Sequence, residues 1–77
     1  MYKIDQRTRQ VLIKMIEKPI IPQRNLTGQL NLSRVQVDYV ITKINESLSD
    51  EGHPPVYFDG NNYHLSEASR LFFVDFF

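Results

Sequence analysis

The sequence predicts a small, mainly α-helical domain in which three helices are followed by a β-hairpin. Two segments with apolar residues at helical spacing lie on either side of a short corner at Asn31-Leu32, the pattern of a helix-turn-helix. Later, two short alternating segments flank Asp59-Gly60-Asn61-Asn62, a run that favours a tight turn. A chain of 77 residues makes one domain at most, so its core must be small.

The first helix is predicted between Asp5 and Lys18. Asp5 can cap its N-terminus and Pro19 ends it. Its core side follows from residues at helical spacing, namely Thr8, Val11, Leu12, Met15 and Ile16. Residues 19–22 are predicted as an extended connector with both isoleucines in the core, because the residue before a proline avoids helical geometry.

The second helix is predicted over residues 23–30, with Pro22 in its first turn. Gly28 lies inside it and costs about 1 kcal/mol relative to alanine, so this helix depends on packing. The third helix starts at Ser33, because Ser33 and Gln36 form an S-x-x-Q capping box. It ends near Glu51-Gly52, and one continuous apolar stripe faces the other helices, namely Val37, Val40, Ile41, Ile44 and Leu48.

The segment after the third helix is broken by His53-Pro54-Pro55 and then alternates over residues 56–58 and 63–65, as expected for a hairpin. Three helices followed by a hairpin make a winged helix, so we assign residues 1–66 to a winged helix-turn-helix domain. Residues 67–77 are predicted as a capped C-terminal helix or the start of a linker to a following domain. This end is too apolar for a free terminus, and we expect it to meet a second subunit or following domains through Leu71, Phe72, Phe73 and Phe76.

The composition limits the possible classes of protein. With no cysteine, neither a disulfide framework nor a thiolate metal site is available, and we expect a cytoplasmic location. No apolar run approaches the ~20 residues of a membrane span. The formal net charge is zero, but residues 1–43 hold eight basic and three acidic side chains, and residues 44–77 hold one and six. A basic face on a neutral domain can bind phosphate, with a steep dependence on salt.

The outward side of the third helix is the predicted DNA-binding surface. Its polar residues are Arg34, Gln36, Tyr39, Thr42 and Lys43. Arginine and glutamine can donate in pairs to guanine or adenine edges, so we expect Arg34 and Gln36 to read bases. The DNA backbone would be held by Ser33, Thr42, Lys43 and Arg24. Asp38 would repel phosphate there unless it accepts from a cytosine amino group or pairs with Arg34.

The tip of the hairpin offers Asn61, Asn62 and His64 to an adjacent groove or phosphate. The same residues beside Gly60 also suit simple turn chemistry, and the tip carries no lysine or arginine. Tyr57 and Tyr63 are expected to pack across the strands rather than to stack on bases.

An enzyme is not expected. The two histidines, His53 and His64, lie on different predicted segments, and neither has neighbours at a spacing that suggests a triad or a metal site. The three glycines are too widely separated for a phosphate-binding loop. We therefore expect no catalytic residue, no cofactor, no metal and no small-molecule ligand in this segment.

The chain resembles the N-terminal DNA-binding domain of bacterial sugar-operon activators regulated by the phosphotransferase system, the mannitol operon activator group, and of the related Mga-type regulators. That group runs Leu-Ala-x-x-Leu-x-Val-Ser-x-Arg-Thr-Ile, then Asp-Ile-x-x-Leu-Asn, then Gly-x-Gly-Tyr-x-Leu. Ten positions match, namely Leu26, Leu30, Leu32, Ser33, Val37, Ile41, Ile44, Asn45, Tyr63 and Leu65. The departures are Val35, Gln36, Asp38, Tyr39, Val40 and Asn61-Asn62.

The resemblance implies sequence-specific binding of double-stranded DNA by the N-terminal domain of a bacterial transcription regulator of a sugar-uptake operon. The alternative is a winged-helix module that binds another protein and not DNA. Neutral net charge, Asp38 and the aromatic terminus favour that alternative. Salt dependence separates the two, because phosphate contacts weaken steeply with salt and an apolar surface does not.

Overall fold

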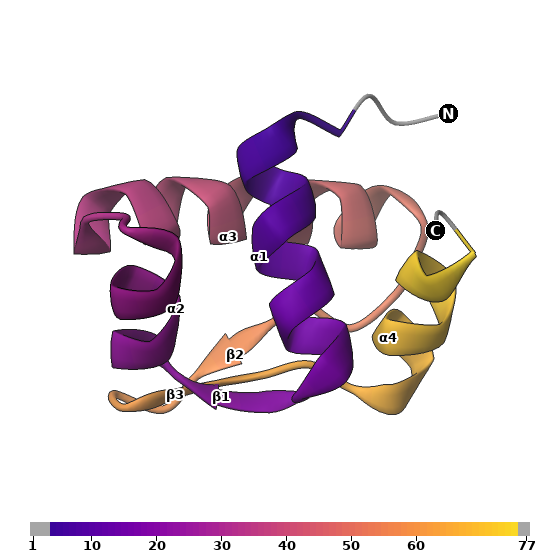
Figure 1. Ribbon diagram of the computed structural model, residues 1–77. Coiled ribbons are helices and arrows are strands. Elements are labelled where there is room, and N and C mark those ends of the chain that lie inside the picture. Colours follow the sequence, from indigo (N-terminus) through magenta and orange to yellow (C-terminus); the bar gives the residue numbers. More distant parts are fainter. Residues whose placement is uncertain (1–3, 76–77) are drawn as a thin grey trace.

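The structure is a computed structural model that describes residues 4–75. Its elements are α1 (Gln6–Glu17), β1 (Ile20–Pro22), α2 (Gln23–Leu30), α3 (Arg34–Asp50), β2 (Tyr57–Phe58), β3 (Asn62–His64) and α4 (Glu67–Val74). In Figure 1, α1 crosses α3, with α2 on one side, α4 on the other and the strands along the opposite edge from α3. The described chain is a compact, mainly helical domain with a three-stranded antiparallel sheet, an arrangement compatible with a winged helix.

Helix α1 forms as the sequence predicts. The Asp5 carboxylate accepts a hydrogen bond from the Thr8 backbone N–H at 2.7 Å, so Asp5 is the N-cap. The helix ends at Glu17, two residues before Pro19. Its buried side chains are Thr8, Val11, Leu12 and Met15, and they join the stripe of α3 in one core.

The corner between α2 and α3 is a tight left-handed turn. Asn31 caps the C-terminus of α2 at a φ of 55°, a conformation that asparagine tolerates better than most residues. The capping box at the start of α3 is confirmed. Ser33 Oγ accepts from the Gln36 N–H at 3.1 Å, and Gln36 Oε1 accepts from the Ser33 N–H at 2.8 Å.

The connector between α1 and α2 is a strand, which the sequence did not predict. Residues 20–22 pair antiparallel with β3, with Ile21 opposite Tyr63. Consecutive side chains of a strand point to opposite faces, so Ile21 is 2% exposed and Ile20 is 54% exposed. The prediction of a buried isoleucine was right for Ile21 and wrong for Ile20. Pro22 is the N-cap of α2 and not a residue of its first turn.

The hairpin, which we call the wing (residues 57–64), is confirmed, with its first strand one residue shorter than expected and its second strand shifted by one residue. Asp59 Oδ1 accepts from the backbone N–H groups of Asn61 and Asn62, at 2.8 and 2.7 Å, and so closes the turn. Across the strands, the rings of Phe58 and Tyr63 stack with centroids 4.6 Å apart. The sheet order is β1-β3-β2, so β3 is the central strand. The wing is thereby joined to β1, the strand between α1 and α2.

Helix α4 packs on α1 and completes the core. Ser66 caps it by accepting from the Ser69 N–H at 3.2 Å. Phe73 is 2% exposed and belongs to the core, whereas Leu71 is 53% exposed. Phe72 is half-buried and packs on His53, with ring centroids 4.6 Å apart. Phe73 is therefore not available to a partner as expected, and Phe76 lies outside the described residues.

Candidate nucleic-acid interface

Three elements are joined by side chains at one end of the molecule: the start of α2, the first half of α3, and the wing. Gln23 Nε2 of α2 donates to the Tyr63 hydroxyl of β3 at 2.9 Å. That hydroxyl donates in turn to Asp38 Oδ1 of α3 at 3.0 Å. A backbone bond from the Gln23 N–H to the Asn61 carbonyl, at 2.9 Å, ties the wing tip to α2 as well. The relative position of the helices and the wing is thus fixed.

Tyr63 is the centre of this connection. The residue is 1% exposed, and burial raises the pKa of its phenol. The hydroxyl therefore keeps its proton, and since it accepts from Gln23 it can give that proton to Asp38. Asp38 is thus held by the wing, and its carboxylate forms no ion pair with Arg34 in the part of the chain that the structure describes.

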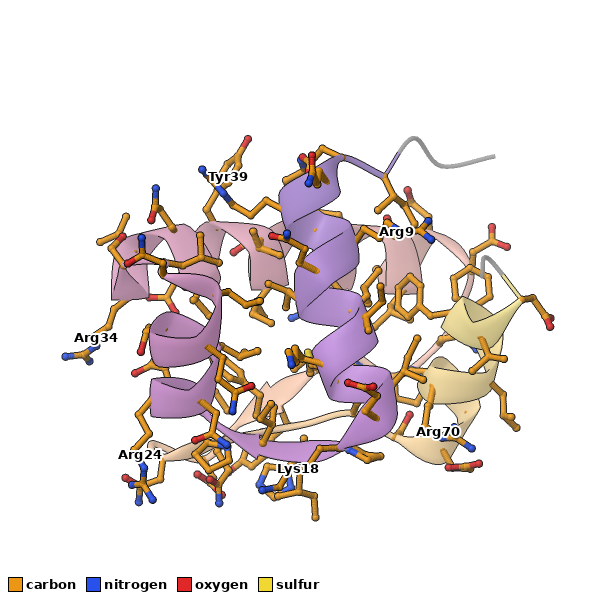
Figure 2. All side chains as sticks on the ribbon, viewed as in Figure 1. Arg9, Lys18, Arg24, Arg34, Tyr39 and Arg70 are labelled. Carbon is orange, nitrogen blue, oxygen red and sulfur yellow. The ribbon has the colours of Figure 1, made fainter. Side chains whose placement is uncertain are left out.

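Arg34 and Arg24 are the free cations of this end. Both side chains are exposed, and neither makes a hydrogen bond or an ion pair with another residue of 4–75. Figure 2 shows them projecting into solvent from the same end of the molecule. The Arg34 charge also acts electrostatically on the Tyr63 hydroxyl and slightly lowers its pKa, against the larger effect of burial. These two guanidinium groups can reach an external anion or a base edge without breaking an internal contact.

Three other predicted contact residues already use their polar atoms within α3. Ser33 and Gln36 bind each other's backbone in the capping box. The Thr42 hydroxyl donates to the Asp38 carbonyl at 2.9 Å. These side chains stabilise the helix. The side-chain oxygen of Gln36 already accepts a hydrogen bond from the Ser33 N–H.

Lys43 and Tyr39 lie on another side of α3, toward the start of α1. Lys43 Nζ pairs with Asp5 Oδ2 at 2.6 Å and lies 5.5 Å from the centre of the Tyr39 ring. The Lys43 ammonium, followed by the Thr8 N–H, lowers the pKa of Asp5 to about 2. Figure 2 shows Tyr39 pointing away from Arg34 and Arg24. The predicted surface is therefore divided into two parts, and only one contains free arginines.

The hydrogen bonds of the wing tip mainly stabilise its own turn. The N–H of Asn62, then His64, then the N–H of Asn61 lower the pKa of Asp59 to about 2, so Asp59 stays ionised. His64 Nε2 lies 2.7 Å from Asp59 Oδ2. Asn61 is exposed and Asn62 is half-buried, and their side-chain amides have no hydrogen-bond partner within residues 4–75. The two amides are the polar groups that the tip can offer.

Within the described range, no group of three or more histidine, cysteine, aspartate or glutamate side chains could hold a metal ion. His53 packs on Phe72 while His64 binds Asp59, so the two histidines serve different parts of the fold. None of the helices between residues 4 and 75 has the length and apolar character to cross a membrane.

Gln23 was not singled out from the sequence, and Tyr63 was assigned to packing alone. Their bonds join residues 40 and 25 positions apart, which no local pattern encodes. The one signal was Asp38, a carboxylate between Arg34 and Lys43 on the predicted DNA-binding side of α3. A scan against protein-family models found no matching family, and comparisons with curated proteins and with solved structures found no similar protein.

Proposed function

We propose that this domain binds double-stranded DNA sequence-specifically, with the first half of α3 in the major groove. The observation that carries the proposal is the pair of free arginines, Arg34 and Arg24, at the end where α2, α3 and the wing are tied together. A helix fits the major groove, and an arginine at its start can bind guanine O6 and N7 together.

Each element has a distinct task in this proposal. Arg34 is the first residue of α3, in the first turn whose backbone the capping box holds. Arg24 lies in the first turn of α2, where the positive end of the helix dipole also favours a phosphate. Asn61 and Asn62 would contact the backbone beside the groove. Lys43, Thr42, Ser33 and Gln36 are supporting residues in this version of the interface.

The wider assignment rests on the sequence resemblance. In that assignment the domain is the N-terminal DNA reader of a larger bacterial transcription regulator of a sugar-uptake operon. A formal net charge of zero implies weak binding by a single domain. We therefore expect useful affinity only when two domains bind two half-sites, as helix-turn-helix dimers do.

The test is fluorescence anisotropy with a mixed pool of labelled duplexes, from ~50 to ~200 mM salt. We expect binding that falls steeply with salt and falls further in Arg34→Ala and Arg24→Ala. If Arg34 binds guanine, Arg34→Ala costs about 1–3 kcal/mol on a selected sequence and relaxes specificity there. Equal loss on selected and random DNA would make Arg34 a phosphate contact.

The matched control is Arg70→Ala. Arg70 lies at the far end of the molecule on α4 and pairs with Glu67 at 2.8 Å, so its removal should leave DNA binding unchanged. If the folded domain binds no duplex at low salt, even when joined as a dimer, the proposal is wrong.

One observation favours protein docking as the second candidate. Val35 and Tyr39 of α3 are 77% and 63% exposed, so this helix presents two large apolar side chains to solvent. A docking role would show as partner binding that persists at high salt and is lost in Tyr39→Ala. The same variant should bind DNA nearly normally under the DNA proposal, since Tyr39 points away from Arg34.

A further inference from the structure

The carboxylate of Asp38 stands in an unexpected place, on the exposed side of α3 one turn after Arg34. A carboxylate on a DNA-binding surface repels phosphate through its negative charge. Because an ionised carboxylate only accepts hydrogen bonds, a role for Asp38 in DNA binding needs a specific donor on the DNA. An arginine four residues before an aspartate has the spacing of a helical ion pair. Within the described residues, however, Asp38 and Arg34 do not form one. Both charges remain available to a ligand.

Hydrogen bonds from the wing and α2 also orient the Asp38 carboxylate. Tyr63 donates to Oδ1 at 3.0 Å, and Gln23 donates to Tyr63 at 2.9 Å, so a chain of two hydrogen bonds runs from α2 through the wing to α3. Both bonds are partly buried, although Asp38 itself is exposed. Oδ2 has no hydrogen-bond partner among residues 4–75. One oxygen is thus anchored while the other has no partner among the described residues, on an exposed residue one helical turn after Arg34.

We propose that Asp38 is a specificity-determining residue that accepts a hydrogen bond from the exocyclic amino group of cytosine in the major groove. Arg34 would bind a guanine close to it, so that the pair selects G·C base pairs. Tyr63 is then a positioning residue, since it acts through the carboxylate that it holds. This inference rests on the proposed DNA-binding function and adds which base the site prefers.

The chemistry of the groove edges favours this assignment. Guanine presents O6 and N7, and thymine presents O4, and all of these acceptors repel a carboxylate. Adenine has an amino donor, but its acceptor N7 lies beside it, whereas cytosine N4 is a donor without such a neighbour. The same charge weakens contact with phosphate at any sequence. Asp38 therefore lowers general affinity and raises discrimination.

The experiment selects preferred sequences from a pool of duplexes with a randomised centre, using the whole chain and three variants. Asp38→Asn keeps an acceptor oxygen for Tyr63 and removes the charge, so the fold is preserved. We expect the wild-type pool to be enriched in cytosine at one position. In Asp38→Asn, the preference for cytosine there should fall by about 5- to 150-fold, the usual range for one base contact. Binding to the unselected pool should tighten.

Glu46→Gln is the matched control, because Glu46 is an exposed carboxylate further along the same helix. Its removal should tighten binding to the unselected pool without changing base preference. Tyr63→Phe should weaken the cytosine preference while leaving the salt dependence unchanged, a result that loss of folding would not give. Urea unfolding of each variant confirms that it is folded.

The outcomes separate this inference from the proposed function. If the wild-type chain binds no duplex at low salt, even when joined as a dimer, the proposed function fails and this inference fails with it. If the wild-type chain selects a sequence and Asp38→Asn selects the same one with equal discrimination, only the role of Asp38 is overturned. Selection of adenine or thymine opposite Asp38 in the wild-type pool would also overturn it.

Discussion

At the scale of single residues, Asp5 joins two separate stabilising contacts in one side chain. Its Oδ1 caps α1 through the Thr8 N–H, and its Oδ2 pairs with Lys43 of α3. Both contacts favour the ionised form and lower the pKa of Asp5 from 3.8 to about 2. Since the folded-state pKa is the lower one, this stabilisation is present above pH 3.8 and is lost as the pH falls toward 2.

Two substitutions at Asp5 separate the cap from the ion pair. Asparagine is as good an N-cap as aspartate but carries no charge, so Asp5→Asn should lower stability only slightly at neutral pH. It should also make the loss of stability between pH 4 and 2 shallower than in the wild type. Asp5→Ala loses the cap as well and should cost about 1 kcal/mol. Urea unfolding at several pH values measures both effects, and an unchanged acid dependence in Asp5→Asn would refute the assignment.

The residues of the candidate site show where sequence reasoning reached its limit. Arg34 and Arg24 could be named because exposed arginines on the first turns of two helices need no internal partner. The engagement of Lys43 could not be foreseen, because its partner is Asp5, 38 residues away. The partner of Asp38 was missed for the same reason. Charge and spacing indicate what a side chain can bind, and only the folded chain shows what it already binds.

At the scale of elements, the helices were predictable because their signals are local. A cap and its target lie three residues apart, as at Asp5 and Ser33, and an apolar stripe repeats within one segment. Strand β1 was not predictable, since three residues ending in proline carry little signal and their partner is β3, far along the chain. The wing was recognised from its turn, although β2 is one residue shorter than expected and β3 is shifted by one residue.

Replacing Gly28 or Gly52 by alanine should change the stability of the domain in opposite directions. A Cβ at Gly28 in α2 would meet no heavy atom within 4 Å, so Gly28→Ala should stabilise the domain by about 1 kcal/mol through helix propensity. Gly52, after α3, has a φ of +72°. Gly52→Ala should therefore destabilise the domain by about 1–2 kcal/mol. Thermal unfolding of the two variants compares them directly, and a shift of the same sign in both would contradict the structure.

At the scale of the whole molecule, α4 is part of the folded unit. Phe73 is 2% exposed and is one of the largest buried side chains. It belongs to the same core as the buried residues of α1 and α3. Because α4 packs on α1, it closes the side of the domain opposite α2 (Figure 1). Among the described residues of α4, the large apolar side chains left exposed are Leu71 and Val74.

Substitutions at a buried and at an exposed position of α4 should have very different effects on the free energy of unfolding. Phe73→Ala should cost about 3–5 kcal/mol, a large part of the roughly 5–15 kcal/mol that stabilises a typical domain. Leu71→Ser, two residues earlier, should change stability by less than about 0.5 kcal/mol. Chemical unfolding gives both values. Equal effects of the two changes would mean that α4 does not pack as described.

The central position of β3 has a consequence for how the chain acquires its structure during synthesis. Strand β1 leaves the ribosome early, but the strand that pairs with it is made after α2, α3 and β2. Until then the exposed edge of residues 20–22 has no partner, and α1 and α2 are joined by an unpaired segment. The helices can form as they emerge, whereas the sheet and the Tyr63 link to Asp38 must wait for the wing. The nascent chain therefore completes its proposed DNA-binding end only after the wing has been made.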